Sequence, residues 1–258
     1  MQREVISVCG CRIELCSAGQ GSPLVILPGA GGAKLYESLA THLSESFRVL
    51  LPQHPGFDAA DDADWLERVD DLAYFHLELL DRLDTGPVTV IGHSLGGWIA
   101  AEMAIRNPRA LRAACLVAPA GIRVPNVNVG DNFLWSAEET LRRLYADPTL
   151  AANAAAGASD TAAVERIFRN RQTTARLVWS PRWFNPSLGK WLHRMRMPTL
   201  LVWGEQDHLF PVAHAEPFAG LIPGSILRVM RDCGHVPFIE KPAEFLAILD
   251  PFLREHAR

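Results

Sequence analysis

The chain contains a strand-to-helix junction that few folds can accommodate. An apolar run at residues 88–91 leads into Gly92-His93-Ser94-Leu95-Gly96-Gly97, and an apolar helical pattern follows at once. Small residues must flank a serine on so sharp a turn, because a side chain at Gly92 or Gly96 would collide with the backbone that doubles back. The sequence therefore predicts a tight turn that exposes the Ser94 hydroxyl at the N-terminus of a helix.

Short apolar runs alternate with helical patterns along much of the chain. Several runs end in Gly or Pro, and their near-continuous hydrophobicity is typical of strands buried on both faces. This alternation predicts an α/β fold with a mostly parallel sheet flanked by helices. Runs at residues 5–8 and 12–16 flank a Cys-Gly-Cys turn and predict an antiparallel hairpin. The predicted parallel strands cover residues 23–27, 48–52, 88–91, 114–118, 199–203 and 226–230.

The regular alternation of strands and helices stops after the fourth of these strands. No convincing parallel strand follows until sheet patterning resumes at Pro198. We therefore expect a helical cap at residues 122–197, inserted into a core of residues 1–121 and 198–258. Its helix-like pieces and alanine-rich stretch cover residues 136–145, 151–158 and 161–179. In the core, apolar spacing also predicts a helix over residues 64–83 with an acidic start.

Composition narrows the class of protein. The 258 residues include 25 Lys and Arg against 29 Asp and Glu, for a net charge of −4, and 48% are hydrophobic. These values are ordinary for a globular protein and argue against a nucleic-acid binder, which would carry a strong basic excess. The sequence shows neither a bilayer-length apolar run nor a signal-peptide layout, which predicts a cytoplasmic protein without a membrane partner. Its five cysteines lack metal-site spacing and are interpreted as reduced.

Later loops offer partners for the serine. A hydroxyl is a weak nucleophile and needs a general base that a carboxylate orients. On a fold of this kind the acid precedes the histidine, each in a loop after a late strand. One such loop contains Asp207 and the next contains His235, so we predict a catalytic triad of Ser94, Asp207 and His235. Glu205 and Asp232 are the competing acids.

Acyl chemistry also needs two backbone N–H donors for the oxyanion. The residue after the nucleophile, Leu95, supplies one. The second is expected from the loop Pro28-Gly29-Ala30-Gly31-Gly32, at Ala30 or alternatively at Gly31. This loop has no phosphate-binding glycine spacing, so it does not indicate nucleotide binding. His93 is expected to order its loop rather than to carry the catalytic proton.

These motifs together resemble the α/β-hydrolase superfamily over nearly the whole chain. The resemblance implies an eight-stranded sheet, a cap after the sixth strand, the triad predicted above, and neither a metal nor an organic cofactor. The matching segments are the glycine-rich loop, His54-Pro55-Gly56-Phe57, Gly-His-Ser-Leu-Gly-Gly, Gly-Glu-Gln-Asp-x-x-x-Pro ending at Pro211, and Cys-Gly-His-x-Pro ending at Pro237.

Two positions depart from familiar patterns within this superfamily. Pro28 stands where the oxyanion loop usually has histidine, which removes one imidazole but leaves the backbone donors. The carbon–carbon hydrolases of meta-ring-fission products are also similar, but they often carry Asn before the nucleophile and Trp after the catalytic histidine. This chain has His93 and Val236 there.

The expected cap carries the only hint about the substrate. Residues 164–196 hold seven arginines and one lysine against one glutamate, a net charge of +7. Such a segment can attract an anion, and its aromatic side chains can line a pocket. In the alternative interpretation the arginines pair with the acidic body and the aromatic residues pack the cap onto the core. The candidate substrate contacts are Arg169, Arg171, Arg176, Trp179 and Trp183.

The sequence thus predicts a serine hydrolase that cleaves a small to medium carboxylic ester or a related acyl compound. Its expected partner is a small-molecule substrate, for which the basic cap makes an anion a candidate. Carbon–carbon hydrolysis of an anionic, diketone-like meta-cleavage product is the first alternative. A ligand receptor and an acyltransferase on the same fold stay open, and the sequence does not indicate an oligomeric state.

Overall fold

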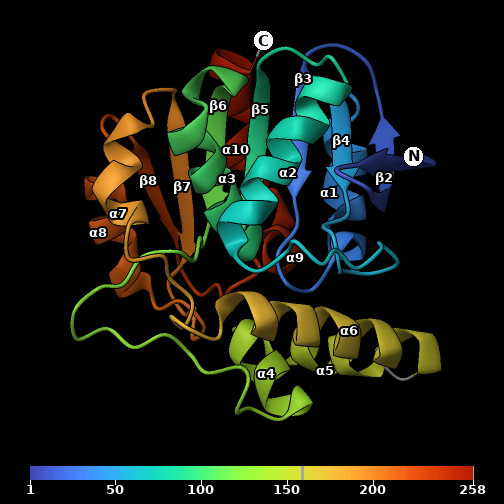
Figure 1. Cartoon of the computed structure of the whole chain (residues 1–258). Coiled ribbons are helices and arrows are strands. Elements are labelled where there is room, and N and C mark those ends of the chain that lie inside the picture. Colours follow the sequence, from blue (N-terminus) through green and yellow to red (C-terminus); the bar gives the residue numbers. More distant parts are fainter. Residues whose placement is uncertain (158–159, 258) are drawn as a thin grey trace.

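A mixed sheet forms the centre of the molecule (Figure 1). The computed structural model describes residues 1–157 and 160–257, and these residues form an eight-stranded sheet in the order β1-β2-β4-β3-β5-β6-β7-β8. β2 pairs antiparallel with β1 and β4, and the remaining pairs are parallel. The strands are β1 (Gln2–Val8), β2 (Cys11–Ala18), β3 (Pro23–Leu27), β4 (Arg48–Pro52), β5 (Val88–His93), β6 (Leu111–Val117), β7 (Thr199–Gly204) and β8 (Ile226–Met230). The predicted fold, with eight mostly parallel strands, is confirmed.

Helices cover both faces of the sheet because successive strand side chains point to opposite faces. Val25 and Leu27 of β3 join one buried cluster, and Leu24 and Ile26 join the other. The first cluster lies under α2 (Val69–Arg82), α3 (Leu95–Arg106) and α8 (Ala215–Gly220). The second lies under α1 (Glu37–Leu43) and α10 (Pro242–His256), while the short α9 (Pro237–Glu240) follows β8. Among the described residues, no helix is long and apolar enough to cross a bilayer.

The helix predicted over residues 64–83 begins later than expected. α2 starts at Val69, where the Asp71 carboxylate accepts hydrogen bonds from the backbone N–H groups of residues 67–68 at 2.9 and 2.8 Å. These bonds cap the helix at that point. Leu66 is nevertheless buried. The prediction was wrong for the first five residues because a loop, and not a helix, buries this apolar side chain.

Helices also fill the segment between β6 and β7. They are α4 (Ala137–Leu144), α5 (Pro148–Ala156), α6 (Thr161–Val178) and the short α7 (Leu188–Trp191). In Figure 1, α4, α5 and α6 form a separate layer beneath the sheet, whereas α7 lies at its side. Leu188 of α7 belongs to the same buried cluster as α3. The segment closes on itself, because Gly121 N–H donates to Trp183 O at 3.1 Å and Asn185 N–H donates to Gly121 O at 2.9 Å.

Candidate active site

Ser94 lies on a strained turn between β5 and α3. Its φ and ψ are 56° and −116°, outside the regions that L-residues favour, and its side chain is nearly buried, at 2% exposed. A Cβ at Gly92 would overlap the Gly96 carbonyl, and one at Gly96 would overlap the carbonyls of residues 27–28. The glycines therefore let the helix N-terminus, Ser94 and the end of β3 approach closely.

The structure brings two of the three predicted triad residues into direct contact. His235 Nδ1 lies 2.7 Å from Asp207 Oδ2, and both residues are buried. The other carboxylate oxygen accepts the backbone N–H groups of Leu209 at 2.8 Å and Phe210 at 2.9 Å. A carboxylate held in this way accepts the Nδ1–H proton and leaves His235 Nε2 as a proton acceptor.

The turn that carries Ser94 contacts His235 through the ring of His93. The rings of His93 and His235 lie 4.6 Å apart between centroids, but the contacts of the described residues include no hydrogen bond from the Ser94 hydroxyl to the imidazole. Such bonds are often long in unliganded enzymes and shorten when substrate binds.

The competing acids lie elsewhere. Glu205 and Asp232 are both exposed. Glu205 accepts the Asp232 backbone N–H at 3.3 Å, and the Asp232 carboxylate accepts the Gln206 amide at 3.2 Å. Of the three candidate acids, Asp207 is thus the one that contacts His235.

The expected oxyanion donors are free. Within the described residues, neither Leu95 N–H nor Ala30 N–H donates a hydrogen bond, and the same holds for Gly31. Leu95 is fully buried at the start of α3, where the helix dipole also favours negative charge. Unpaired N–H groups beside a buried serine are suited to stabilising an oxyanion.

A buried hydrogen-bonded chain joins the glycine-rich loop to the segments that carry His93 and His235. His93 Nε2–H donates to the His235 carbonyl at 2.8 Å, which leaves His93 Nδ1 as an acceptor for the Tyr36 hydroxyl at 2.6 Å. The same hydroxyl accepts the Gly29 N–H at 2.7 Å. Burial, followed by the nearby His235, lowers the pKa of His93 well below its ordinary value, in keeping with a neutral ring.

His54 supplies an imidazole to the glycine-rich loop from outside it. Its Nε2–H donates to the Pro28 carbonyl at 2.9 Å, and its Nδ1 accepts from His76 Nε2–H at 2.7 Å. Burial lowers the pKa of His54 to about 4. Sequence reasoning missed this role, although the His54-Pro55-Gly56-Phe57 turn was visible, because nothing in the sequence places it beside Pro28.

Replacing Tyr36 with phenylalanine is expected to loosen the site without changing the fold. The variant leaves buried Gly29 N–H and His93 Nδ1 unpaired, and each such group costs about 1–3 kcal/mol. We expect a lower free energy of unfolding by that order and a kcat reduced by about 10-fold or more. Denaturant titration and steady-state kinetics measure the two effects, with Tyr74→Phe, at an exposed tyrosine, as the control. Equal kcat values for both variants would contradict the positioning role.

Stability is expected to fall as the pH drops from about 6.5 toward 4. Burial lowers the pKa values of His54, His76 and His93, so below about pH 6.5 the unfolded chain binds protons that the folded chain does not. Each such histidine costs about 1.4 kcal/mol per pH unit in that window. Urea unfolding at pH 7, 6 and 5 should show that the free energy of unfolding falls less steeply with pH in His54→Gln than in wild type. A control at exposed His193 should keep the wild-type slope.

Two of the three arginines proposed as substrate contacts have other partners. Arg171 donates to the carbonyls of residues 132, 133 and 135 at 2.9, 2.9 and 3.3 Å. Arg169 donates to the Gly56 carbonyl at 3.3 Å and lies 3.7 Å from the Asp62 carboxylate. Arg176 is exposed. Two of the three guanidinium groups thus hold backbone segments together.

Aromatic rings border His235. Trp183 is 1% exposed and packs against Phe133 and Phe210 at centroid distances of 5.9 and 5.4 Å. The Phe210 ring in turn lies 5.5 Å from that of His235. Trp179 is 56% exposed and carries the Arg182 guanidinium 4.2 Å above its ring. Of the two tryptophans, Trp183 is therefore the one that packs near His235, with Phe210 between them.

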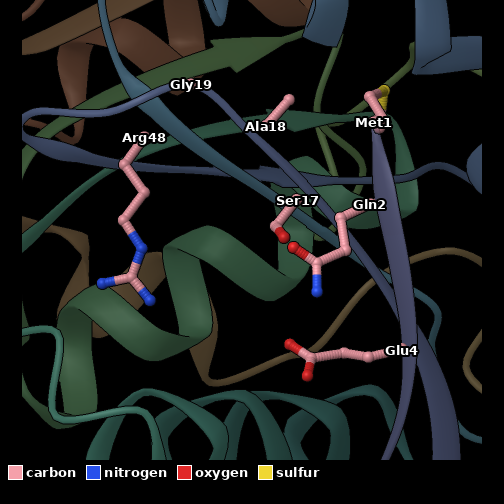
Figure 2. A pocket seen from close by; sticks show the side chains of 7 residues that line it. All are labelled: Met1, Gln2, Glu4, Ser17, Ala18, Gly19 and Arg48. Atoms are coloured by element: carbon pink, nitrogen blue, oxygen red, sulfur yellow. The ribbon is translucent and has the colours of Figure 1, made fainter.

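Two open cavities lie away from this site. One, of about 520 Å³, opens beside the first two strands (Figure 2), and its lining residues are Met1, Gln2, Glu4, Ser17, Ala18, Gly19 and Arg48. The other, of about 240 Å³, lies between α1 and α10. Neither is lined by Ser94, Asp207 or His235. Ser94 and His235 are themselves only 2% and 3% exposed.

Comparisons with known proteins identify the family of the chain. The sequence profile of the Alpha/beta hydrolase family matches residues 24–248. The 2-hydroxymuconate semialdehyde hydrolase of Pseudomonas sp. (strain CF600) is 28% identical over 98% of this chain and 94% of its own length. Solved structures with the same fold include a meta-cleavage product hydrolase from Pseudomonas fluorescens IP01 (TM-score 0.80, 21% identity, 98% and 97% coverage) and a thermophilic esterase from Thermogutta terrifontis (TM-score 0.74, 24% identity, 99% of both chains). The chain therefore belongs to the Alpha/beta hydrolase family and is a hydrolase.

Proposed function

We propose that this hydrolase cleaves a small to medium, uncharged carboxylic ester through an acyl-enzyme. Ser94 Oγ attacks the carbonyl carbon while His235 Nε2 takes its proton, and Asp207 holds the resulting imidazolium. Leu95 and Ala30 N–H groups bind the oxyanion. His235 then protonates the leaving alcohol, and water releases the acid with His235 again as the base.

The buried pair of His235 and Asp207 beside the strained Ser94 turn carries this proposal. The 2.7 Å contact fixes the tautomer that general-base catalysis needs. The Leu95 and Ala30 N–H groups also support acyl chemistry, because within the described residues they have no hydrogen-bond acceptor and are free to bind an oxyanion.

The cap favours an uncharged substrate. Arg169 and Arg171 are occupied by backbone carbonyls, and Arg182 pairs with Asp131 at 2.6 Å. Apart from Asp207, the side chains on this side of His235 include the uncharged rings of Phe210 and, packed against it, Trp183. A buried carboxylate needs a cation or several hydrogen-bond donors to offset its loss of hydration.

Carbon–carbon hydrolysis is the second candidate, favoured by the 2-hydroxymuconate semialdehyde hydrolase that matches 98% of this chain. Such a substrate is anionic and needs a cation inside the covered site. Arg182 is the cap residue best suited to that role, because its Nε is buried without a hydrogen-bond partner. In that reaction Asp131 would have to share or release this guanidinium.

A parallel assay separates the two functions. Wild type and Ser94→Ala are tested with p-nitrophenyl esters from acetate to decanoate and with 2-hydroxymuconate semialdehyde, and a fluorophosphonate probe reports labelling of Ser94. We expect Ser94-dependent ester turnover with a chain-length optimum and at least about 100-fold lower kcat/KM for the anion. The reverse preference would replace the ester assignment with carbon–carbon hydrolysis. Absence of labelling and of turnover on both substrates would refute the Ser94 mechanism.

A further inference from the structure

Helix α6 contacts the loop that contains Asp58. That loop also forms a hydrogen bond with the backbone next to the glycine-rich loop. From α6, the Asn170 side-chain oxygen accepts the Asp58 backbone N–H at 2.7 Å, and its amide donates to Asp58 Oδ1 at 3.1 Å. Asn170 is buried, whereas Asp58 is partly exposed. The Thr173 hydroxyl adds a bond to the Gly56 carbonyl at 2.7 Å.

The second oxygen of the same carboxylate faces the glycine-rich loop. Asp58 Oδ2 accepts the Ala33 N–H at 2.9 Å, directly after the turn that Gly32 N–H closes on the Gly29 carbonyl at 3.1 Å. A Cβ at Gly32 would overlap this carboxylate. Ala30, the proposed oxyanion donor, lies within that turn. One side chain thus connects α6 to the position of the donor.

The backbone of Asp58 has a positive φ in this arrangement. Its φ of 51° lies in the left-handed region, which residues other than glycine usually avoid. In the closed structure Asn170 binds both its N–H and its carboxylate. If α6 moves away, these bonds are lost, and the Asp58 backbone can leave this less common conformation and take its carboxylate from Ala33.

Other contacts of the cap attach a different part of it to a different loop. The His235 N–H donates to the Leu144 carbonyl at 2.7 Å, and Glu240 accepts the Asp147 N–H at 3.0 Å. The link between α4 and α5 is therefore attached to the histidine loop, whereas α6 is attached to the loop of residues 56–62.

We propose that Asn170 and Asp58 form a latch that couples docking of α6 to formation of the oxyanion hole. The inference rests on the proposed function, because Ala30 matters only if an oxyanion forms. With α6 undocked the site is open and the Ala30 donor is out of place. With α6 docked, the site is covered and the Ala30 N–H is in position to bind the oxyanion. Asn170 and Asp58 are positioning residues, since neither needs to touch the substrate.

Asn170→Ala and its matched control, Thr173→Val, test the latch. Both remove α6 bonds to the loop of residues 56–62, but only Asn170 connects to Ala33 through Asp58. Amide hydrogen exchange of residues 28–36 is the first readout. We expect Asn170→Ala to speed it by about 10-fold, the factor that corresponds to about 1.4 kcal/mol, and Thr173→Val to change it by less than about 2-fold.

Kinetics on the ester that wild type prefers give the second readout. Asn170→Ala is expected to lower kcat by about 10-fold with little change in KM, whereas Thr173→Val keeps the wild-type kcat. If Asn170→Ala does not fold, Asp58→Asn replaces it. That variant keeps a residue tolerant of positive φ and an acceptor for Ala33, but sets an amide against the Asn170 amide, and it should shift both readouts in the same direction.

The two readouts separate the latch from the proposed function. Equal exchange of residues 28–36 in Asn170→Ala and Thr173→Val, or exchange at the wild-type rate in Asn170→Ala, overturns the latch even if ester turnover is normal. If wild type hydrolyses no ester, the proposed function fails, but accelerated exchange in Asn170→Ala alone still establishes the coupling of α6 to the loop.

Discussion

Ser94→Ala is expected to lower kcat on the preferred ester by a factor on the order of 10⁴ or more. The substitution removes the attacking oxygen but leaves the His235–Asp207 pair and the two free N–H groups in place. Residual turnover would come from binding and the oxyanion donors alone. Because the lost atom makes no hydrogen bond to His235 within the described residues, the thermal midpoint should stay close to that of wild type.

Ser187→Ala serves as the matched control, since Ser187 is an exposed serine outside the site. It should retain wild-type kcat and thermal midpoint. Full activity in Ser94→Ala would exclude Ser94 as the nucleophile. A large drop in its thermal midpoint would instead show that the loss of activity reflects unfolding.

Gly96→Ala should have the largest effect on stability among single methyl additions at this turn. The new methyl would overlap the backbone carbonyls of Leu27 and Pro28, which cannot rotate away as a side chain can. We expect a loss of about 3 kcal/mol or more in the free energy of unfolding, or about 6–12 °C in thermal midpoint. Activity should fall as well, because the displaced carbonyls belong to the end of β3 and the glycine-rich loop.

The control for this change is Gly220→Ala at the end of α8, where a new Cβ meets no atom within 4 Å. Its free energy of unfolding should stay within about 0.5 kcal/mol of wild type. Thermal unfolding followed by circular dichroism compares the two variants. Equal midpoints would show that β3 and α3 do not approach as closely as the structure describes.

Local sequence patterns predicted the sheet and the turn at Ser94 because both depend on neighbouring residues. The apolar run Leu24-Val25-Ile26-Leu27 is buried on both faces as expected, and the glycines beside Ser94 are required by backbone contacts within the same turn. Glu205 directly follows its strand, at the tight exit, which favoured Asp207 as the acid, and the structure places Asp207 against His235.

The supporting groups could not be found in this way. Tyr36, His54 and Asp58 act through hydrogen bonds to residues distant in the sequence, such as His93, Pro28 and Asn170, and no local spacing marks such pairs. The net charge of the cap segment also did not reveal what its arginines bind. The basic segment suggested an anion site, but Arg169 and Arg171 bind backbone carbonyls. A count of charged residues in the sequence does not include these neutral acceptors.

The bridge at Gly121 has a consequence for how this chain can vary. Because Gly121 bonds to both Trp183 and Asn185, the polypeptide leaves and rejoins the core at nearly the same point. Residues 122–182 therefore form a closed excursion, whose length can change without stretching β6 or β7. We expect helical segments of different size to be tolerated there while β6 and β7 keep their register.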